Sequence, residues 1–178
     1  MKYFIASDIH GSFKFCKMMV EAFQKSGADK LVLLGDILYH GPRNDLPQEY
    51  NPKKVIELLN NISQKIICVR GNCDAEVDQM VLDFPILCEN SSILIENKAI
   101  YLTHGHHLER LNSKKGDIVI FGHTHIPKFE KENGVLQINP GSVSLPKENS
   151  PHSYIIFENN IFSFYNLETN EIYKKESI

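Results

Sequence analysis

Several features that would indicate a membrane, zinc-finger or nucleic-acid-binding protein are missing from this chain. Its apolar runs are short, and none approaches the roughly 18 residues that a membrane-spanning helix needs. The four cysteines form no CxxC pair and have no zinc-finger spacing, which excludes a zinc finger. The formal net charge of -3 gives no reason to expect a stable complex with a nucleic-acid backbone.

A removable leader is not indicated either. Met1 and Lys2 lead directly into an apolar segment that carries candidate ligands, so we expect no signal peptide and a cytoplasmic protein with free thiols. The length of 178 residues, with 42% hydrophobic and 23% charged residues, is ordinary for a soluble globular protein. Because no repeat, low-complexity tract or linker interrupts the chain, we expect one domain over residues 1–178.

One pattern is present five times along the chain. A short apolar run ends in a small or polar residue and is followed by a carboxylate, an amide or an imidazole. The runs cover residues 3–6, 31–34, 66–69, 100–103 and 118–121. In open α/β sheets, ligands bind beyond the carboxyl ends of the strands. The pattern therefore predicts a site with seven candidate metal ligands, which are Asp8, His10, Asp36, Asn72, His104, His123 and His125.

Strands and helices alternate in the first part of the predicted structure, and short strands dominate after Asp74. We expect strands over 3–6, 31–34 and 66–69, with helices over 13–26 and from Pro52 onward. The later strands are expected at 84–88, 92–96, 99–102, 118–121, 128–131, 135–138, 153–157, 161–165 and 171–173. This order predicts an α/β fold in which parallel strands mix with hairpins, as two packed sheets with helices outside. The long loop over 37–50 is expected to be functional or disordered.

The seven ligands are too many for one ion, because structural zinc usually takes four. They divide between two ions if one carboxylate is shared, and Asp36, alone at its strand end with two oxygens, is the natural bridge. A set of imidazoles and carboxylates without thiolate suits manganese, iron, zinc or nickel. Two ions about 3.5–4 Å apart can hold both sides of a displacement at phosphorus, so a phosphate ester is the natural substrate.

The same residues resemble the five signature blocks of the calcineurin-like metallophosphoesterases. The blocks are Asp8-Ile9-His10, Gly35-Asp36, Gly71-Asn72, His104-Gly105-His106 and Gly122-His123-Thr124-His125, in the family's order and spacing over residues 3 to about 146. Four further segments resemble the small bacterial YfcE-type phosphodiesterases within that superfamily. They are Gly41–Asn44, Arg70–Asp74, Glu76–Met80 and Asn139–Val143.

The resemblance implies a four-layer αββα sandwich, in which two mixed β-sheets are flanked by helices. It also implies a centre of two divalent ions, commonly manganese, that hydrolyses phosphodiesters. Carried over by position, Asp8, His10 and His125 would hold one ion, Asn72, His104 and His123 the other, and Asp36 would bridge them. We assign catalytic roles to Asp36, Asn72 and His104, and substrate contacts to Arg43, Asn44, Cys73 and His106.

One position departs from many relatives, which have a histidine directly after the asparagine ligand to protonate the leaving group. Here that residue is Cys73. A thiol with a pKa of about 8.5 is a poor substitute for the histidine unless its surroundings change that pKa. We therefore expect substrates with poor leaving groups to react slowly. Activated nitrophenyl esters should not be slowed by the weak proton donor. His106 is a candidate for taking over the proton transfer.

These observations predict a metal-dependent phosphodiesterase that acts on a small phosphodiester. Two alternatives stay open: a phosphomonoesterase or nucleotide phosphatase, and a non-catalytic scaffold of the same fold. The scaffold is disfavoured because such relatives typically lose some ligands, and all seven are present here. We expect neither a stable nucleic-acid complex nor membrane association. The resemblance is compatible with a homodimer or a homotetramer.

Overall fold

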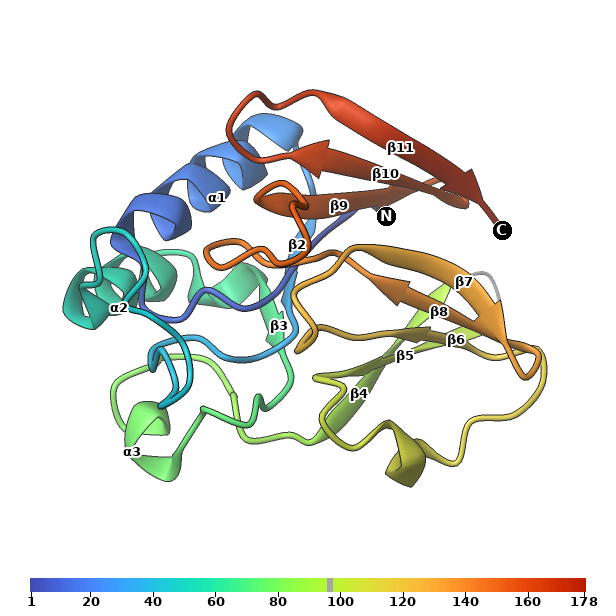
Figure 1. The fold of residues 1–178 in the computed structure, drawn as a ribbon, viewed down its shortest axis with the longest axis horizontal. Helices are drawn as coiled ribbons and strands as arrows, with labels where there is room; N and C mark the ends of the chain where they lie inside the picture. The colour runs from blue at the N-terminus through green and yellow to red at the C-terminus, as the bar shows by residue number, and fades with distance from the viewer. Residues whose placement is uncertain (96–97) are drawn as a thin grey trace.

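The continuous apolar runs of the first strands form a sheet that is buried on both faces. The computed structural model describes residues 1–95 and 98–178, and Figure 1 shows two packed sheets with helices outside them. The first sheet has the order β11-β10-β9-β1-β2-β3. Its strands are β1 (Tyr3–Ala6), β2 (Lys30–Leu33), β3 (Ile66–Cys68), β9 (Ser153–Glu158), β10 (Ile161–Asn166) and β11 (Ile172–Ser177). The predicted parallel pairing of β1 with β2 and of β2 with β3 is confirmed.

The second sheet has the order β4-β5-β6-β8-β7, with parallel pairs in the centre and an antiparallel pair at each edge. Its strands are β4 (Asn90–Ile95), β5 (Lys98–Thr103), β6 (Ile118–Ile120), β7 (Lys128–Glu132) and β8 (Val135–Asn139). β5, β6 and β8 are parallel, so their carboxyl ends meet at one edge, as those of β1, β2 and β3 do. The expected hairpin of β4 and β5 is present, but Glu96 and Asn97 in its turn lie outside the described residues.

Two capped helices cover the outer face of the first sheet (Figure 1). Helix α1 (Phe13–Ser26) begins after Ser12, whose hydroxyl accepts the N–H of Phe15, and ends at Gly27 in a left-handed conformation. Helix α2 (Pro52–Asn60) begins after the predicted cap Asn51. On the second sheet the helical cover is short. Leu108 of the 3₁₀-helix η2 (Leu108–Leu111) lines the same surface pocket as Gln137, and the alternation of β8 places Gln137 on the outer face.

Alternate residues of the central strands divide between two cores. Phe4 and Ala6 of β1 pack toward α1, whereas Tyr3 and Ile5 pack between the sheets, where Phe162 and Phe164 of β10 fill the space. Burial on both faces explains why these strands are continuously apolar. The two cores thus fix the strand ends on which the candidate ligands lie.

The strand expected over 84–88 is wrong. Pro85 has no backbone N–H, the N–H of Ile86 donates to Oε1 of Gln79 at 2.8 Å, and the carbonyl of Cys88 accepts from Arg70 at 2.8 Å. The backbone groups of Ile86 and Cys88 thus bond outside any strand ladder among the described residues. Gln79 belongs to a helix that the sequence analysis missed, α3 (Glu76–Gln79), and η1 (Ser63–Lys65) is a further short 3₁₀-helix. No helix in the described ranges has both the length and the apolarity for a bilayer crossing.

Candidate metal centre

The backbone is unusual at five of the seven candidate ligands. Each of the five follows a strand and has a positive φ angle, namely Asp8 (59°), His10 (49°), Asp36 (55°), His123 (65°) and His125 (63°). Left-handed backbone is uncommon outside glycine, and such strain concentrates at functional sites, where the surrounding structure holds it in place. At these positions the backbone turns away from the strand direction, so that the side chains of the candidate ligands face one another.

Hydrogen bonds between neighbouring strand ends lock the turns together. The N–H of Asp8 donates to the carbonyl of Gly35 at 3.2 Å, and that of His10 to the carbonyl of Asp36 at 2.9 Å. In the second sheet the N–H of Gly122 donates to the carbonyl of His104 at 2.9 Å. The positions of the candidate ligands are therefore coupled through the backbone.

One group of ligand atoms converges around Asp8. Its Oδ1 lies 3.2 Å from Nε2 of His125 and 3.6 Å from Nε2 of His10, and these two nitrogens are 3.2 Å apart. Asp8 is fully buried, and Oδ1 has no hydrogen-bond partner among the described residues. A buried carboxylate oxygen without a hydrogen bond beside two imidazole nitrogens fits a cation that these three groups share.

A second group converges around Asp36. Its Oδ2 lies 3.4 Å from Nε2 of His104 and 3.6 Å from Nε2 of His10, so this carboxylate lies between the two groups. Nε2 of His104 is in turn 3.0 Å from Oδ1 of Asn72. The ring of His123 packs 5.0 Å from that of His104, centroid to centroid. The position of Asp36 is that of a carboxylate able to serve two ions.

Three histidines are held in the tautomer that a metal ligand requires. Nδ1 of His10 lies 2.8 Å from the carbonyl of Tyr39, and those of His104 and His125 lie 2.6 Å from the carbonyls of Leu34 and Leu145. A carbonyl oxygen can only accept, so each Nδ1 carries the proton in the neutral ring. The lone pair is therefore on Nε2, which in all three residues faces the carboxylates.

The carboxylates and imidazoles shift one another's proton affinity. Burial alone would raise the pKa of Asp8, but its contacts with His10 and His125 outweigh burial and hold the pKa well below the usual value. The pKa of Asp36 is lowered in the same sense, because His104 outweighs burial. Burial would lower the pKa of His104, but Asp36 and Asp8 raise it to about 9. The site thus holds two carboxylates in their charged form and attracts positive charge.

Two supporting residues had no assigned role in the sequence analysis. Buried Asp74 accepts the N–H groups of Asp36 and Gly71 on Oδ2 and that of Ile37 on Oδ1, at 2.7 to 2.9 Å. Asn139 donates to the carbonyl of Gly122 at 2.7 Å and so holds the turn before His123. Both positions lie in segments that resemble the family, but only the folded chain shows which backbone groups they contact.

Close backbone packing also fixes Asp36. Gly71 lies against its carboxylate, and a Cβ at this position would overlap Oδ1 and the backbone nitrogen of Asp36. Oδ1 accepts the N–H of Cys73 at 2.8 Å, which leaves Oδ2 facing the histidines. Glycine is therefore required at position 71 by the absence of room for a side chain.

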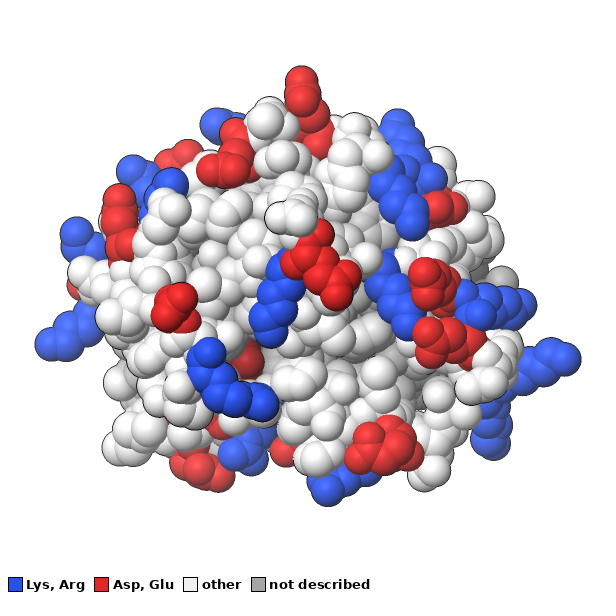
Figure 2. Space-filling view, in the orientation of Figure 1, with Lys and Arg blue, Asp and Glu red and all other residues white. Residues whose placement is uncertain are grey.

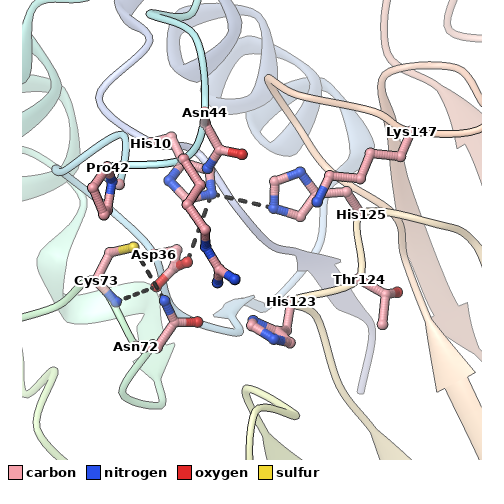
Figure 3. A pocket seen from close by; sticks show the side chains of 12 residues that line it. His10, Asp36, Pro42, Asn44, Asn72, Cys73, His123, Thr124, His125 and Lys147 are labelled. Atoms are coloured by element: carbon pink, nitrogen blue, oxygen red, sulfur yellow. Dashed lines mark hydrogen bonds and ion pairs between the residues drawn. The ribbon is translucent and has the colours of Figure 1, made fainter.

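The ligands open onto a cavity of about 470 Å³. Figure 3 shows His10, His123 and His125 around it, with Pro42 and Cys73 on one side and Lys147 on the other. The lining includes three of the residues expected to contact substrate, which are Arg43, Asn44 and Cys73, together with the unexpected Thr124 and Lys147. His106 is not among the lining residues, and its ring lies 5.5 Å from that of His104 and 6.1 Å from that of His123.

Cys73 is poorly suited to donate a proton at this site. Burial is the largest cause and the charge of Asp36 the second, and together they raise the pKa of the Cys73 thiol to about 12. The surroundings therefore make this thiol a weaker acid than an ordinary cysteine, so they do not compensate for the missing histidine.

The comparison with known families agrees with this geometry. The profile of the calcineurin-like phosphoesterase superfamily domain matches residues 1–160. The chain belongs to this superfamily. The superfamily implies divalent metal ions, and the Asp and His groups described above are able to hold a metal ion.

Individual members of the superfamily resemble the chain over most or all of its length. It is 46% identical to the phosphodiesterase YfcE of Escherichia coli K12, over 100% of this chain and 98% of that protein. It is 30% identical to the phosphodiesterase MJ0936 of Methanocaldococcus jannaschii, over 79% of this chain and 83% of that protein. The solved structure of E. coli YfcE, described as a phosphoesterase, superimposes with a TM-score of 0.95 over 100% of both chains.

Solved structures with lower sequence identity share the fold alone. Vps29 from Entamoeba histolytica, solved in complex with Zn²⁺, is 20% identical, with a TM-score of 0.63 over 100% of this chain and 98% of that one. The expected α/β architecture of two mixed sheets with helices is thus confirmed.

Proposed function

We propose that this calcineurin-like phosphoesterase is a metal-dependent phosphodiesterase that hydrolyses small phosphodiesters at a centre of two divalent ions. The observation that carries the proposal is the convergence of carboxylate oxygens and Nε2 atoms from strand ends of both sheets beside an open cavity. Its relatives of 46% and 30% identity are named phosphodiesterases, which supports the same reaction class.

The residues present fit such a centre. Asp8, His10 and His125 would hold one ion, and Asn72, His104 and His123 would hold the other, with Asp36 shared between them. The unpartnered Oδ1 of Asp8 and the Nδ1 protons fixed on three histidines support this division. Manganese is the ion we expect, and zinc, iron and nickel suit the same donors. When bound, two such ions neutralise phosphate charge and lower the pKa of an attacking water.

The chain's own cationic and amide groups would then orient the ester. The guanidinium of Arg43 can donate two parallel hydrogen bonds to the non-bridging oxygens of a phosphate. The amide nitrogen of Asn44 donates to the carbonyl of His40 at 2.8 Å, and its oxygen, which has no hydrogen-bond partner among the described residues, can accept from a substrate hydroxyl. Both residues come from the loop over 37–50, which also supplies the carbonyl that orients His10.

Proton delivery limits which esters react. Because the raised pKa of Cys73 makes it a poor acid, esters of activated alcohols such as nitrophenol should react fastest, since their leaving groups need no proton. His106, the candidate from the sequence for proton transfer to other leaving groups, is not among the residues that line the cavity. The four cysteines are free thiols, which supports the proposal that the protein works in the cytoplasm.

Hydrolysis of bis-p-nitrophenyl phosphate in the presence of manganese tests the proposal. We expect turnover by the unchanged protein and a loss on the order of 100-fold or more in Asp36→Ala and His123→Ala, because each removes a metal ligand. Lys17→Ala, an exposed position on α1, is the control and should retain activity. Equal activity in the ligand variants would contradict the metal assignment.

Two further measurements separate the alternatives. Faster turnover of p-nitrophenyl phosphate than of the diester would favour a phosphomonoesterase. Tightly bound metal without turnover of either ester would favour a scaffold.

A further inference from the structure

The cavity contains a cationic side chain that the proposed reaction does not use. Lys147 lines the wall formed by Thr124 and His125. In Figure 3 its side chain reaches from its own turn toward the ring of His125, across the cavity from Pro42 and Cys73. Its side chain therefore borders the cavity on the side opposite Pro42 and Cys73.

The backbone of Lys147 is fixed by the same turn that orients a candidate ligand. Its N–H donates to the carbonyl of His125 at 3.3 Å, and its carbonyl accepts the N–H and the hydroxyl of Ser150 at 3.0 and 2.6 Å. Two residues before it, the carbonyl of Leu145 accepts from Nδ1 of His125 at 2.6 Å. The two residues after it, Glu148 and Asn149, have φ angles of 52° and 58°. The turn thus places a lysine at a defined position relative to the centre.

The side chain of Lys147 is exposed, and the described part of the chain provides no ion-pair partner for its charge. Among the described residues, neither Lys147 nor Arg43 has a carboxylate oxygen within ion-pair distance, whereas Lys128 pairs with Glu130 and Glu132. The cavity lining includes one carboxylate, Asp36, whose oxygens are occupied by Cys73 and the histidines. On the face shown in Figure 2, acidic and basic side chains are otherwise interspersed. Uncompensated positive charge in a cavity raises its affinity for anions.

A simple phosphodiester does not use all of this charge or space. It carries a single negative charge, and the guanidinium of Arg43 is already suited to its oxygens. The cavity of about 470 Å³ is large enough for a whole substituent beside the reacting phosphate. An ammonium group with three donors binds a phosphate dianion well, as in phosphate-binding loops.

We propose that Lys147 forms a subsite for a second phosphate, so that the preferred substrates are phosphodiesters carrying a phosphomonoester on one substituent. This inference rests on the proposed phosphodiesterase function, since it names the substrate class of the same site. Lys147 would act in binding and specificity, not in the chemical step.

Two chromogenic esters that differ by one phosphate test the subsite. Thymidine 5′-(4-nitrophenyl) phosphate and its 3′-phosphorylated derivative have the same leaving group and the same reacting phosphate. We expect the manganese-loaded protein to show the lower KM for the 3′-phosphorylated ester. In Lys147→Ala that KM should rise about two- to fivefold, a loss typical of one exposed charge contact. The KM for the other ester and both kcat values should change less than about twofold.

Lys147→Arg should keep the preference, and Lys17→Ala, which removes the same charge from α1, should not alter it. A Lys147→Ala variant that changes the KM of both esters equally, or of neither, would overturn the subsite. If the unchanged protein hydrolyses neither of these esters nor bis-p-nitrophenyl phosphate, the proposed function fails, and calorimetry then tests Lys147 alone. Tighter binding of thymidine 3′,5′-bisphosphate than of thymidine 5′-phosphate, lost in Lys147→Ala, supports the subsite, and equal affinities contradict it.

Discussion

Backbone carbonyl groups, and not side chains, orient three of the candidate ligands. The oxygens that hold Nδ1 of His10, His104 and His125 belong to the main chain of three separate segments. Substitution of the side chains at those positions leaves the oxygens in place, so the tautomers of the histidines depend on the fold more than on any one neighbour. The two carboxylates are held in the same way by main-chain N–H groups of Cys73 and His123.

Gly71→Ala tests whether this close packing is essential. The added methyl group would displace the carboxylate of Asp36, so we expect activity on bis-p-nitrophenyl phosphate to fall on the order of 100-fold or more. The matched control is Gly27→Ala at the end of α1, where a Cβ meets no atom within 4 Å but the φ angle is 66°. It should cost about 1 kcal/mol of stability, measured by urea unfolding, and leave activity intact. Full activity in Gly71→Ala would show that Asp36 has room to move.

At the scale of single elements, periodicity and cap residues predicted most of the fold. The apolar runs of β1 and β2 and the Ser12 cap of α1 are local signals, and the structure confirms all three. The segment over 84–88 has the composition of a strand, but its hydrogen-bond partners are Gln79 and Arg70, which no local pattern reveals. β11 likewise runs well beyond the three residues expected for it.

In the candidate site, too, some residues could be predicted from local sequence pattern and others could not. The ligands follow strand ends and were found from local pattern, which the family resemblance reinforced. Asp74 and Lys147 were given no role because each depends on a contact between distant segments: Asp74 with the turn after β2, and Lys147 with the turn that holds His125. The residue types, a loop acid and a loop lysine, do not distinguish them from solvated surface residues, and the family-like segment around Asp74 does not show which backbone groups it contacts.

A histidine joins α1 to the segment that follows β8. The ring of His152 stacks on Phe15 of α1 with 3.8 Å between centroids, and its Nδ1 lies 2.8 Å from the carbonyl of Val143. Burial lowers the pKa of His152 in the folded protein and outweighs that hydrogen bond. The unfolded chain therefore takes up a proton more readily than the folded one. The stability contributed by this residue is complete above an unfolded-state pKa of about 6.5, and it falls as the pH drops toward the folded-state pKa.

We therefore expect His152→Gln to reduce the pH dependence of folding. The free energy of unfolding in urea, measured without added metal at pH 8 and pH 5.5, should fall more for the unchanged protein than for the variant. Comparing the two proteins cancels the contributions of the other histidines. An equal fall in both would contradict the assigned direction of the pKa shift.

At the scale of the whole molecule, the centre lies where the two sheets meet. Asp8, His10 and Asp36 follow strands of the first sheet, whereas His104 and His125 follow strands of the second. The core between the sheets fixes their relative position, because Ile5 of β1 and Ile120 of β6 belong to the same buried cluster. A metal centre at this place links residues that are more than 100 positions apart in the chain.

The central claim is that these strand ends hold two ions with Asp36 between them. An anomalous difference map, recorded at the manganese absorption edge from crystals grown with manganese, tests it most directly. We expect two peaks in each chain, one against Asp8, His10 and His125 and one against Asn72, His104 and His123, with Asp36 touching both. A single peak, or peaks away from Asp36, would contradict it.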